Sequence, residues 1–243
     1  MDSRLGPRKF PLVRPQFSRT GFARGGASIE SFDDRTESLS ISIPFSQSNS
    51  DGANMTESLR GRFLIAAKRL RDDNFYKTVV LLLEHGEHGA MGLVINRPSS
   101  IKVAHALAGH FDLPETEDVV FGGGPVEPSA LVILHDDSAF QDDSPSVLPG
   151  LFVGGSPDAF EQVIGEAAAS DSLKHSFRVF SGYSGWGAGQ LEGEIARGDW
   201  LIHPACREIV FHEDPYAIYD TILQKFYAAN HILPLRVKDA SAN

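Results

Sequence analysis

The chain has 243 residues, of which 42% are hydrophobic and 22% are charged. These values are typical of a globular protein and provide enough apolar side chains for one large domain. The apolar run Val79–Leu83 stops at Glu84, and such runs fall far short of the about 20 residues that cross a bilayer, so we expect no membrane association. The single cysteine, Cys206, excludes an internal disulfide and suits a reducing cytoplasm, and no apolar signal segment follows Met1.

Residues 1–54 differ in composition from the rest of the chain, with many prolines and serines and no hydrophobic period. Such a stretch cannot bury enough apolar surface to offset the entropy of ordering, so we expect a disordered extension. Its first 29 residues are rich in arginine and poor in acids, which is also the composition of an organelle transit peptide. A solvated tail and a true start at Met55 are the simpler alternatives. We expect residues 55–243 to form one folded domain.

The predicted domain is strongly acidic. Residues 55–243 carry 15 Lys and Arg against 26 Asp and Glu, a formal charge of −11, while the whole chain carries −10. An acidic surface repels phosphate backbones, so we expect no direct binding of nucleic acid. A basic cluster between Arg60 and Arg71 is the local exception, and a solvated edge is its simpler explanation.

Strand and helix patterns alternate along the domain. Strands are expected at 61–67 and 75–84, and the glycines of His85–Gly89 predict a hairpin turn into a third strand at 90–96. Pro98 ends that strand, and Ser99 or Ser100 then predicts the cap of a helix through Ala108 that Gly109 closes.

The second half continues the alternation. Strands are expected at 119–121, 130–135, 151–153, 177–180, 200–203 and 209–211. Ser156 with Pro157 predicts a helix start, residues 189–197 predict a second helix, and Pro215 starts a last one with a stripe at Ile218, Ile222, Leu223 and Phe226. Hairpins with scattered helices favour the α+β class over regular βαβ winding.

Seven segments in order carry a resemblance to a known family. They read GRFLIAA, FYKTVVLLLEH, GAMGLVINRP, FGGGPV, LVILHDD, FSGYSGWGAGQLEGEI and DWL, between about Gly61 and Phe226. Their order resembles the AlgH/YqgE family of bacterial proteins. The chain departs from the family pattern at Lys68–Asp73, where a proline-containing loop is expected, and at Ser129 and Ala130, where a basic residue is common.

This resemblance implies an α+β fold in which mixed β-sheets, with a small barrel-like unit, are surrounded by helices. The family is largely uncharacterised, and one branch is named for an effect on alginate-production genes, which implies a role in transcriptional regulation. No settled catalytic residues come with the resemblance.

Several polar motifs are candidates for a binding site, each with a structural alternative. His85 belongs to the turn EHGEH, whose histidine spacing does not match a zinc helix, so we expect a polar turn and no metal. Asn96 and Arg97 end a buried strand, where Arg could bind an anion and Asn could bond local backbone instead. Gly122, Gly123 and Gly124 could cradle an anion, or simply permit a tight bend.

The segment Gly182–Gln190 is the most unusual in composition. Tyr183 and Gln190 could face a ligand from a flexible loop, although Trp186 as a core residue with turn-forming glycines explains the same letters. Ser184 lacks the G-x-S-x-G context of a nucleophile, and Cys206 is expected to be unreactive.

Two hypotheses of function follow. The first is a non-enzymatic regulatory or interaction protein that binds a protein partner or a small ligand and uses no cofactor, because no catalytic motif is assembled. The second is a metabolite-binding protein or an enzyme that uses the loops at His85, Asn96, Arg97, Gly122–Gly124 and Gln190. The two are distinguished by whether these groups converge in one concave site.

Overall fold

The computed structural model describes residues 57–108, 117–138, 146–169 and 176–230. The expectations for residues 1–54, for Gly109 and for the chain beyond 230 lie outside this part.

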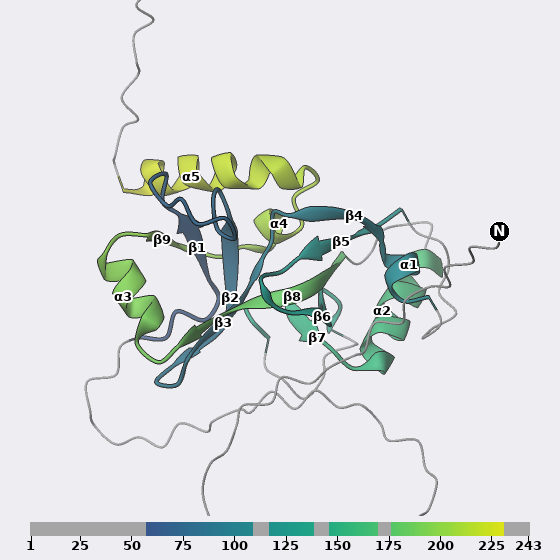
Figure 1. Ribbon diagram of the computed structural model, residues 1–243. Helices are drawn as coiled ribbons and strands as arrows, with labels where there is room; N and C mark the ends of the chain where they lie inside the picture. The colour runs from purple at the N-terminus through teal and green to yellow at the C-terminus, as the bar shows by residue number, and fades with distance from the viewer. Residues whose placement is uncertain (1–56, 109–116, 139–145, 170–175, 231–243) are drawn as a thin grey trace, which may run out of the picture.

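Nine strands and five α-helices are found in the described part (Figure 1). The strands are β1 (Arg62–Ala66), β2 (Val79–Gly86), β3 (Gly89–Val94), β4 (Pro98–Lys102), β5 (Val119–Gly122), β6 (Val126–His135), β7 (Phe152–Gly154), β8 (Phe177–Gly187) and β9 (Trp200–Pro204). The helices are α1 (Val103–Ala106), α2 (Pro157–Ala169), α3 (Gln190–Ala196), α4 (Arg207–Val210) and α5 (Ile218–Ala229), and the 3-10 helix η2 (Pro215–Ala217) precedes α5.

The strands form one mixed sheet in the order β4-β5-β8-β3-β2-β1-β9; off this path, β6 pairs with β8 and β7 pairs with β6. Most neighbours are antiparallel, and β5 runs parallel to β8. This arrangement confirms the α+β class. The described strands do not close into a barrel: β4 and β9 are the two ends of an open path.

Strand β8 joins the two halves of the sheet. Its first part lies between β5 and β6, where Val179 pairs with Val120 and with Ile133. Its last part pairs with β3, where Trp186 lies opposite Ala90. The sequence predicted a strand only to Phe180 and a loop afterwards, and that loop prediction was wrong. Glycines make the segment look like a loop, but here they let neighbouring backbones approach closely.

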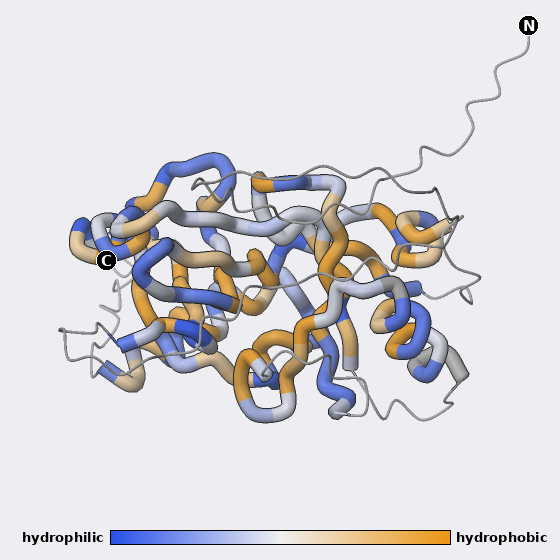
Figure 2. Tube along the Cα trace, turned by 90° about the horizontal axis from the view of Figure 1, so that it is seen from below, coloured by the Kyte–Doolittle hydropathy of each residue, from blue (hydrophilic) through white to orange (hydrophobic). Residues whose placement is uncertain are grey.

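Two hydrophobic clusters hold the fold together. The larger one packs β1, β2 and β3 against residues of α4 and α5, including the fully buried Phe63 and Ile222. The smaller one packs α1 and α2 on β5, β6 and β8 around Phe160. Figure 1 shows α5 lying across β1 at one end and α2 beside β6 and β7 at the other. In Figure 2 the hydrophobic segments run through the strands in the interior.

Helix α2 follows the predicted cap. The Ser156 hydroxyl accepts the backbone N–H of Ala159 at 3.1 Å, and Pro157 is the first helical residue. The β2–β3 hairpin is also confirmed, with Gly86 paired to Gly89 across a two-residue turn.

Two further element predictions were wrong. Residues 99–102 were expected in a helix but continue as β4, because they pair with β5 (Lys102 lies opposite Val119). Pro98 is tolerated there because it is the first residue of an end strand. Residues 209–211 were expected in a strand, whereas Ile209 and Val210 are the buried residues of α4. An apolar run this short has no period that separates the two structures.

Candidate functional site

An open cavity of about 450 Å³ lies where three distant segments meet. They are the turn before β2, the link between β3 and β4, and the start of α5. The residues that line it are Lys77, Asn96, Arg97, Pro98, Tyr216, Tyr219 and Asp220. Its volume falls in the usual range for small-molecule sites. Of the residues proposed from sequence, Asn96 and Arg97 belong to this lining.

Asn96 fixes one wall of the cavity. Its Oδ1 accepts the backbone N–H of Val79 at 2.9 Å, and its Nδ2 donates to the carbonyl of Lys77 at 2.9 Å. The side chain thus takes the place of a further ladder pair where β3 ends beside β2. Both polar groups of the Asn96 side chain are therefore used to hold the turn before β2 against the link after β3.

Arg178, on β8, ties this wall to the segment that leads into α5. Its guanidinium donates to the carbonyls of Ile95, at 3.3 Å, and His212, at 2.5 Å. The same group lies 4.5 Å from the ring centre of Phe121. Burial lowers the pKa of Arg178 to about 10, so it remains charged at neutral pH. A charged donor between two carbonyls makes stronger hydrogen bonds than a neutral one, which favours a rigid cavity.

Two hydrogen bonds hold the α5 side of the cavity. The Asp214 Oδ1 accepts the backbone N–H of Tyr216 at 2.9 Å and caps η2. The Tyr219 hydroxyl donates to the carbonyl of Ala66 on β1 at 2.8 Å. These bonds hold η2 and the start of α5 in place beside β1.

Four other lining side chains carry a charge or a hydroxyl: Lys77, Arg97, Tyr216 and Asp220. The Lys77 ammonium lies 5.8 Å from the ring centre of Tyr76. Arg97 makes one long hydrogen bond, from Nη2 to the carbonyl of Asp73 at 3.3 Å. Burial lowers the pKa of Arg97, and the charge of Asp72 partly opposes this shift. Within the described segments, no ion pair links Lys77 or Arg97 to a carboxylate. The lining itself holds two cations, Lys77 and Arg97, against one carboxylate, Asp220, and this excess of positive charge attracts an anion.

Lys77 reaches its position through an unusual backbone conformation. Its φ is +54°, in the left-handed region that side chains other than glycine and asparagine rarely adopt. Such a conformation costs on the order of 1–3 kcal/mol and persists only where the surroundings enforce it. Here the carbonyl of Lys77 is held by Asn96, and Thr78 bonds back to Phe75.

His85 lies at the other end of β3, by the hairpin. Its Nδ1 accepts the backbone N–H of Leu59 at 3.2 Å. Its Nε2 lies 3.0 Å from Glu192 Oε1 of α3, within ion-pair distance but outside hydrogen-bond geometry. The imidazole is only 4% exposed, so it links the hairpin to α3 from within the protein.

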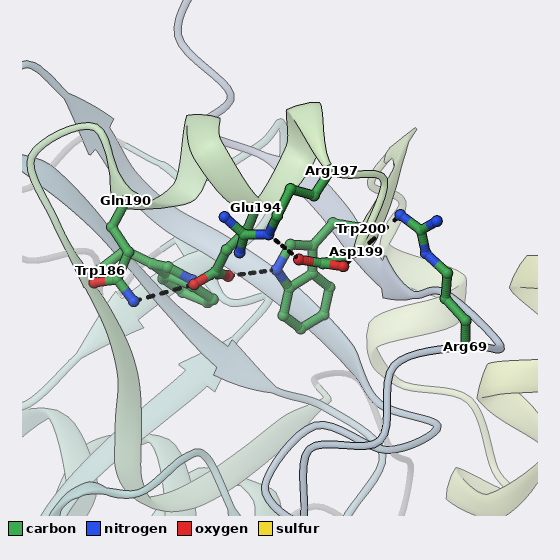
Figure 3. A network of polar contacts seen from close by, with 7 residues as sticks. All are labelled: Arg69, Trp186, Gln190, Glu194, Arg197, Asp199 and Trp200. Atoms are coloured by element: carbon green, nitrogen blue, oxygen red, sulfur yellow. Dashed lines mark hydrogen bonds and ion pairs between the residues drawn. The ribbon is translucent and has the colours of Figure 1, made fainter.

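Gln190 belongs to a polar network around Glu194 at this same end (Figure 3). Its Oε1 accepts the N–H of Gly187 at 3.1 Å, and its Nε2 donates to Glu194 Oε1 at 3.1 Å. Glu194 Oε2 accepts both indole N–H groups, from Trp186 at 2.9 Å and from Trp200 at 2.8 Å. A single carboxylate thus joins α3 to β8 and β9. Trp186 is 6% exposed, in agreement with the alternative interpretation of the sequence, in which it is a core residue.

Gly123, Gly124 and Tyr183 lie between these two ends. A Cβ on Gly123 would come within 2.3 Å of the carbonyl oxygen of Gly182, and one on Gly124 within 2.3 Å of the Tyr183 backbone. The Ser184 hydroxyl donates to the carbonyl of Gly123 at 3.2 Å. Tyr183 is 9% exposed, and burial, with the charge of Glu127, raises its pKa. This glycine segment therefore lies in close backbone contact with β8.

Metal ligands, a membrane-spanning helix and a reactive thiol are the remaining features that bear on function. No group of three or more His, Cys, Asp or Glu side chains comes together among the described residues as metal ligands. No helix among them is long and apolar enough to cross a membrane. Burial raises the pKa of the Cys206 thiol, which lowers its thiolate fraction at neutral pH.

Comparison with known proteins decides the family. The family model described as AlgH-like matches residues 63–229. The chain belongs to the AlgH-like family. A UPF0301 protein of Myxococcus xanthus is 41% identical over 164 residues, which make up 66% of this chain and 87% of that protein. A UPF0301 protein of Cupriavidus pinatubonensis is 42% identical over 162 residues, covering 65% of this chain and 82% of that protein.

Solved structures agree with this assignment. The solution structure of the AlgH protein from Pseudomonas aeruginosa matches with a TM-score of 0.57 and 32% identity over 80% of this chain and 99% of that one. A crystal structure of a Corynebacterium diphtheriae protein has the same TM-score at 21% identity, covering 76% of this chain and 92% of that one, and shows the shared fold. The names of these relatives state no activity, and the cavity is interpreted from its own chemistry.

Sequence reasoning missed five residues of the cavity and its frame: Lys77, Arg178, Tyr216, Tyr219 and Asp220. Lys77 sits within a predicted strand, and nothing local indicates its left-handed conformation. Tyr216 could have been noticed, because an aromatic ring directly after the helix-starting Pro215 is outside the apolar stripe of α5.

Proposed function

We propose that this AlgH-like protein is a non-enzymatic regulatory or interaction protein that acts by binding a small ligand in the cavity between Lys77 and Asp220. The observation that supports this is that the lining residues have two different roles. Asn96 and Tyr219 use their polar groups in hydrogen bonds that hold the walls. The charged or hydroxyl groups of the other lining residues are proposed to bind the ligand: Lys77, Arg97, Tyr216 and Asp220. A preformed site of this type favours binding because little has to be ordered.

The structure gives less support to the second hypothesis, an enzyme whose active site is built from the loops that the sequence suggested. His85 and Gln190 lie by the β2–β3 hairpin, while Asn96 and Arg97 follow the opposite end of β3. The six residues of β3 separate the two ends by about 20 Å at roughly 3.3 Å per residue. The cavity lining contains no Ser, Thr, Cys or His to act as an ordinary nucleophile with its base.

The proposed effect on transcription is indirect. The net charge of −10 disfavours contact with DNA, so the ligand-bound protein would act through a protein partner. Retention of the full-length chain on random duplex DNA at physiological salt would contradict this part of the proposal.

A ligand screen tests the main part. The full-length chain is heated with a library of metabolites, in parallel with Arg97→Gln and with Lys225→Gln, an exposed α5 cation outside the cavity. A ligand at a hundredfold excess over its Kd raises stability by about 2.7 kcal/mol. We expect one compound class to stabilise the wild type and Lys225→Gln equally, and Arg97→Gln much less.

Two outcomes would overturn the proposal. The first is the absence of any stabilising compound across the library, which would remove the small-ligand site. The second is conversion of a stabilising compound into a product, as measured by NMR of the mixture. Such a conversion would make the protein an enzyme.

A further inference from the structure

The cavity has two chemically different sides. Lys77 and Arg97 come from the turn before β2 and the link before β4, and both are cationic. Tyr216, Tyr219 and Asp220 come from η2 and α5 and supply aromatic rings and one carboxylate. A ligand that satisfies both sides carries an anionic group at one end and hydrogen-bond donors at the other.

The cationic side suits a phosphate. The guanidinium of Arg97 presents five N–H donors, of which one is bonded to Asp73. Lys77 adds a compact charge on a flexible stem, and its ammonium lies 5.8 Å from the ring centre of Tyr76. Partial burial of Arg97 limits the screening of its charge by salt, which strengthens its attraction for an anion.

The α5 side suits a planar ring. Tyr216 is 76% exposed, and its backbone is fixed by the Asp214 cap. An exposed aromatic ring is a stacking platform for a base, worth about 1–3 kcal/mol. Asp220 lies in the first turn of α5, directly after η2, and lines the same cavity as Tyr216. Its carboxylate accepts hydrogen bonds and donates none.

The volume of the cavity and the chemistry of its lining together limit the class of ligand that fits. A cavity of about 450 Å³ accommodates a molecule of mononucleotide size. Guanine offers two adjacent N–H donors on one edge, which a single carboxylate can accept together, whereas adenine offers one amino group beside an acceptor. We propose that the cavity binds a guanine mononucleotide, with its phosphate at Lys77 and Arg97, its base on Tyr216, and its ring N1–H and exocyclic amino group donating to Asp220. This inference rests on the proposed function and names the ligand class of the same cavity.

Titration calorimetry with the full-length chain tests the assignment. GMP, AMP, guanosine and inorganic phosphate are the probes. We expect GMP to bind at least tenfold more tightly than guanosine, because of the phosphate, and at least tenfold more tightly than AMP, because of Asp220. GMP affinity is expected to fall as salt is raised.

Four variants locate each part of the ligand. Lys77→Asn, which tolerates the left-handed backbone, and Arg97→Gln should each weaken GMP at least tenfold and bring it toward guanosine. Tyr216→Ala should weaken GMP and AMP alike, by about fivefold or more. Asp220→Asn should lower the preference for GMP over AMP and leave AMP nearly unchanged. Lys225→Gln is the matched control and should bind like the wild type.

Each outcome separates this inference from the proposed function. Equal Kd values for GMP in the Tyr216, Arg97 and Lys225 variants would place the nucleotide elsewhere and overturn the inference. If GMP does not bind, while a compound from the metabolite screen loses affinity in Arg97→Gln, the ligand class is wrong and the binding function stands. If no compound of any class binds, both proposals fail. Unfolding midpoints of every variant without ligand show whether a loss reflects the fold.

Discussion

Glu194 is the side chain whose removal is expected to disturb the fold most clearly. Its Oε2 accepts the indole N–H groups of Trp186 and Trp200, which are 6% and 3% exposed, and its Oε1 accepts from Gln190. In Glu194→Ala all three donors lose their partner. A hydrogen bond to a charged group contributes about 1.5–3 kcal/mol, and each buried donor left unpaired costs about 1–3 kcal/mol. Water that enters beside the half-buried position would recover part of this.

We therefore expect Glu194→Ala to lower the free energy of unfolding by about 2–5 kcal/mol. Urea unfolding followed by tryptophan fluorescence and by far-UV circular dichroism measures this. The chain has 2 tryptophans, and both donate to Glu194, so the native emission spectrum should change as well. Glu194→Gln should be intermediate, because an amide can accept from the indoles only by turning its NH₂ toward Gln190.

Glu161→Ala provides the control, since Glu161 is an exposed helical carboxylate of α2. Exposed substitutions of this kind change stability by about 0.5 kcal/mol or less. If Glu194→Ala were no more destabilising than Glu161→Ala and left the emission spectrum unchanged, the shared carboxylate would not hold α3 to the sheet.

Three further predictions concern the fold. Burial raises the pKa of Glu84 more than the charge of Arg60 lowers it, so the folded state keeps this proton to higher pH, and ionisation costs stability as pH rises above the unfolded value of 4.5. Glu84→Gln should therefore raise the melting temperature at pH 7, with a gap that closes toward pH 4; a lower melting temperature at pH 7 would contradict this. Cys206 should react with iodoacetamide at pH 8 more slowly in the native protein than in urea, and equal rates would show a thiol that burial does not protect. Gly124→Ala should destabilise by about 2 kcal/mol or more in urea unfolding, because the new Cβ meets the Tyr183 backbone, whereas Gly165→Ala, with no atom within 4 Å, should stabilise α2 by about 0.5–1 kcal/mol; similar effects at both glycines would refute the packing argument.

Much of the local structure could be predicted from the sequence. Apolar runs identified β1 and β2, two glycines identified the hairpin that joins β2 to β3, and Ser156 with Pro157 identified the start of α2. These features depend on side chains a few residues apart, because turns and caps are made by local hydrogen bonds and by allowed φ values. Asn96 and Arg97 were singled out because a polar pair that ends a buried strand is conspicuous, and both line the cavity.

The sequence alone determined the α+β class, the order of most elements and the family. The tertiary structure decided which candidate residues meet and which do not. Lys77 and Asp220 share a cavity although 143 residues separate them, while His85 and Arg97, close in sequence, lie at opposite ends of β3. It also made Glu194 the partner of two tryptophans and placed Arg178 between two carbonyls. The physical reason is that a side chain's role is set by the polar groups that packing brings within about 3 Å of it, and most of those groups belong to distant parts of the chain.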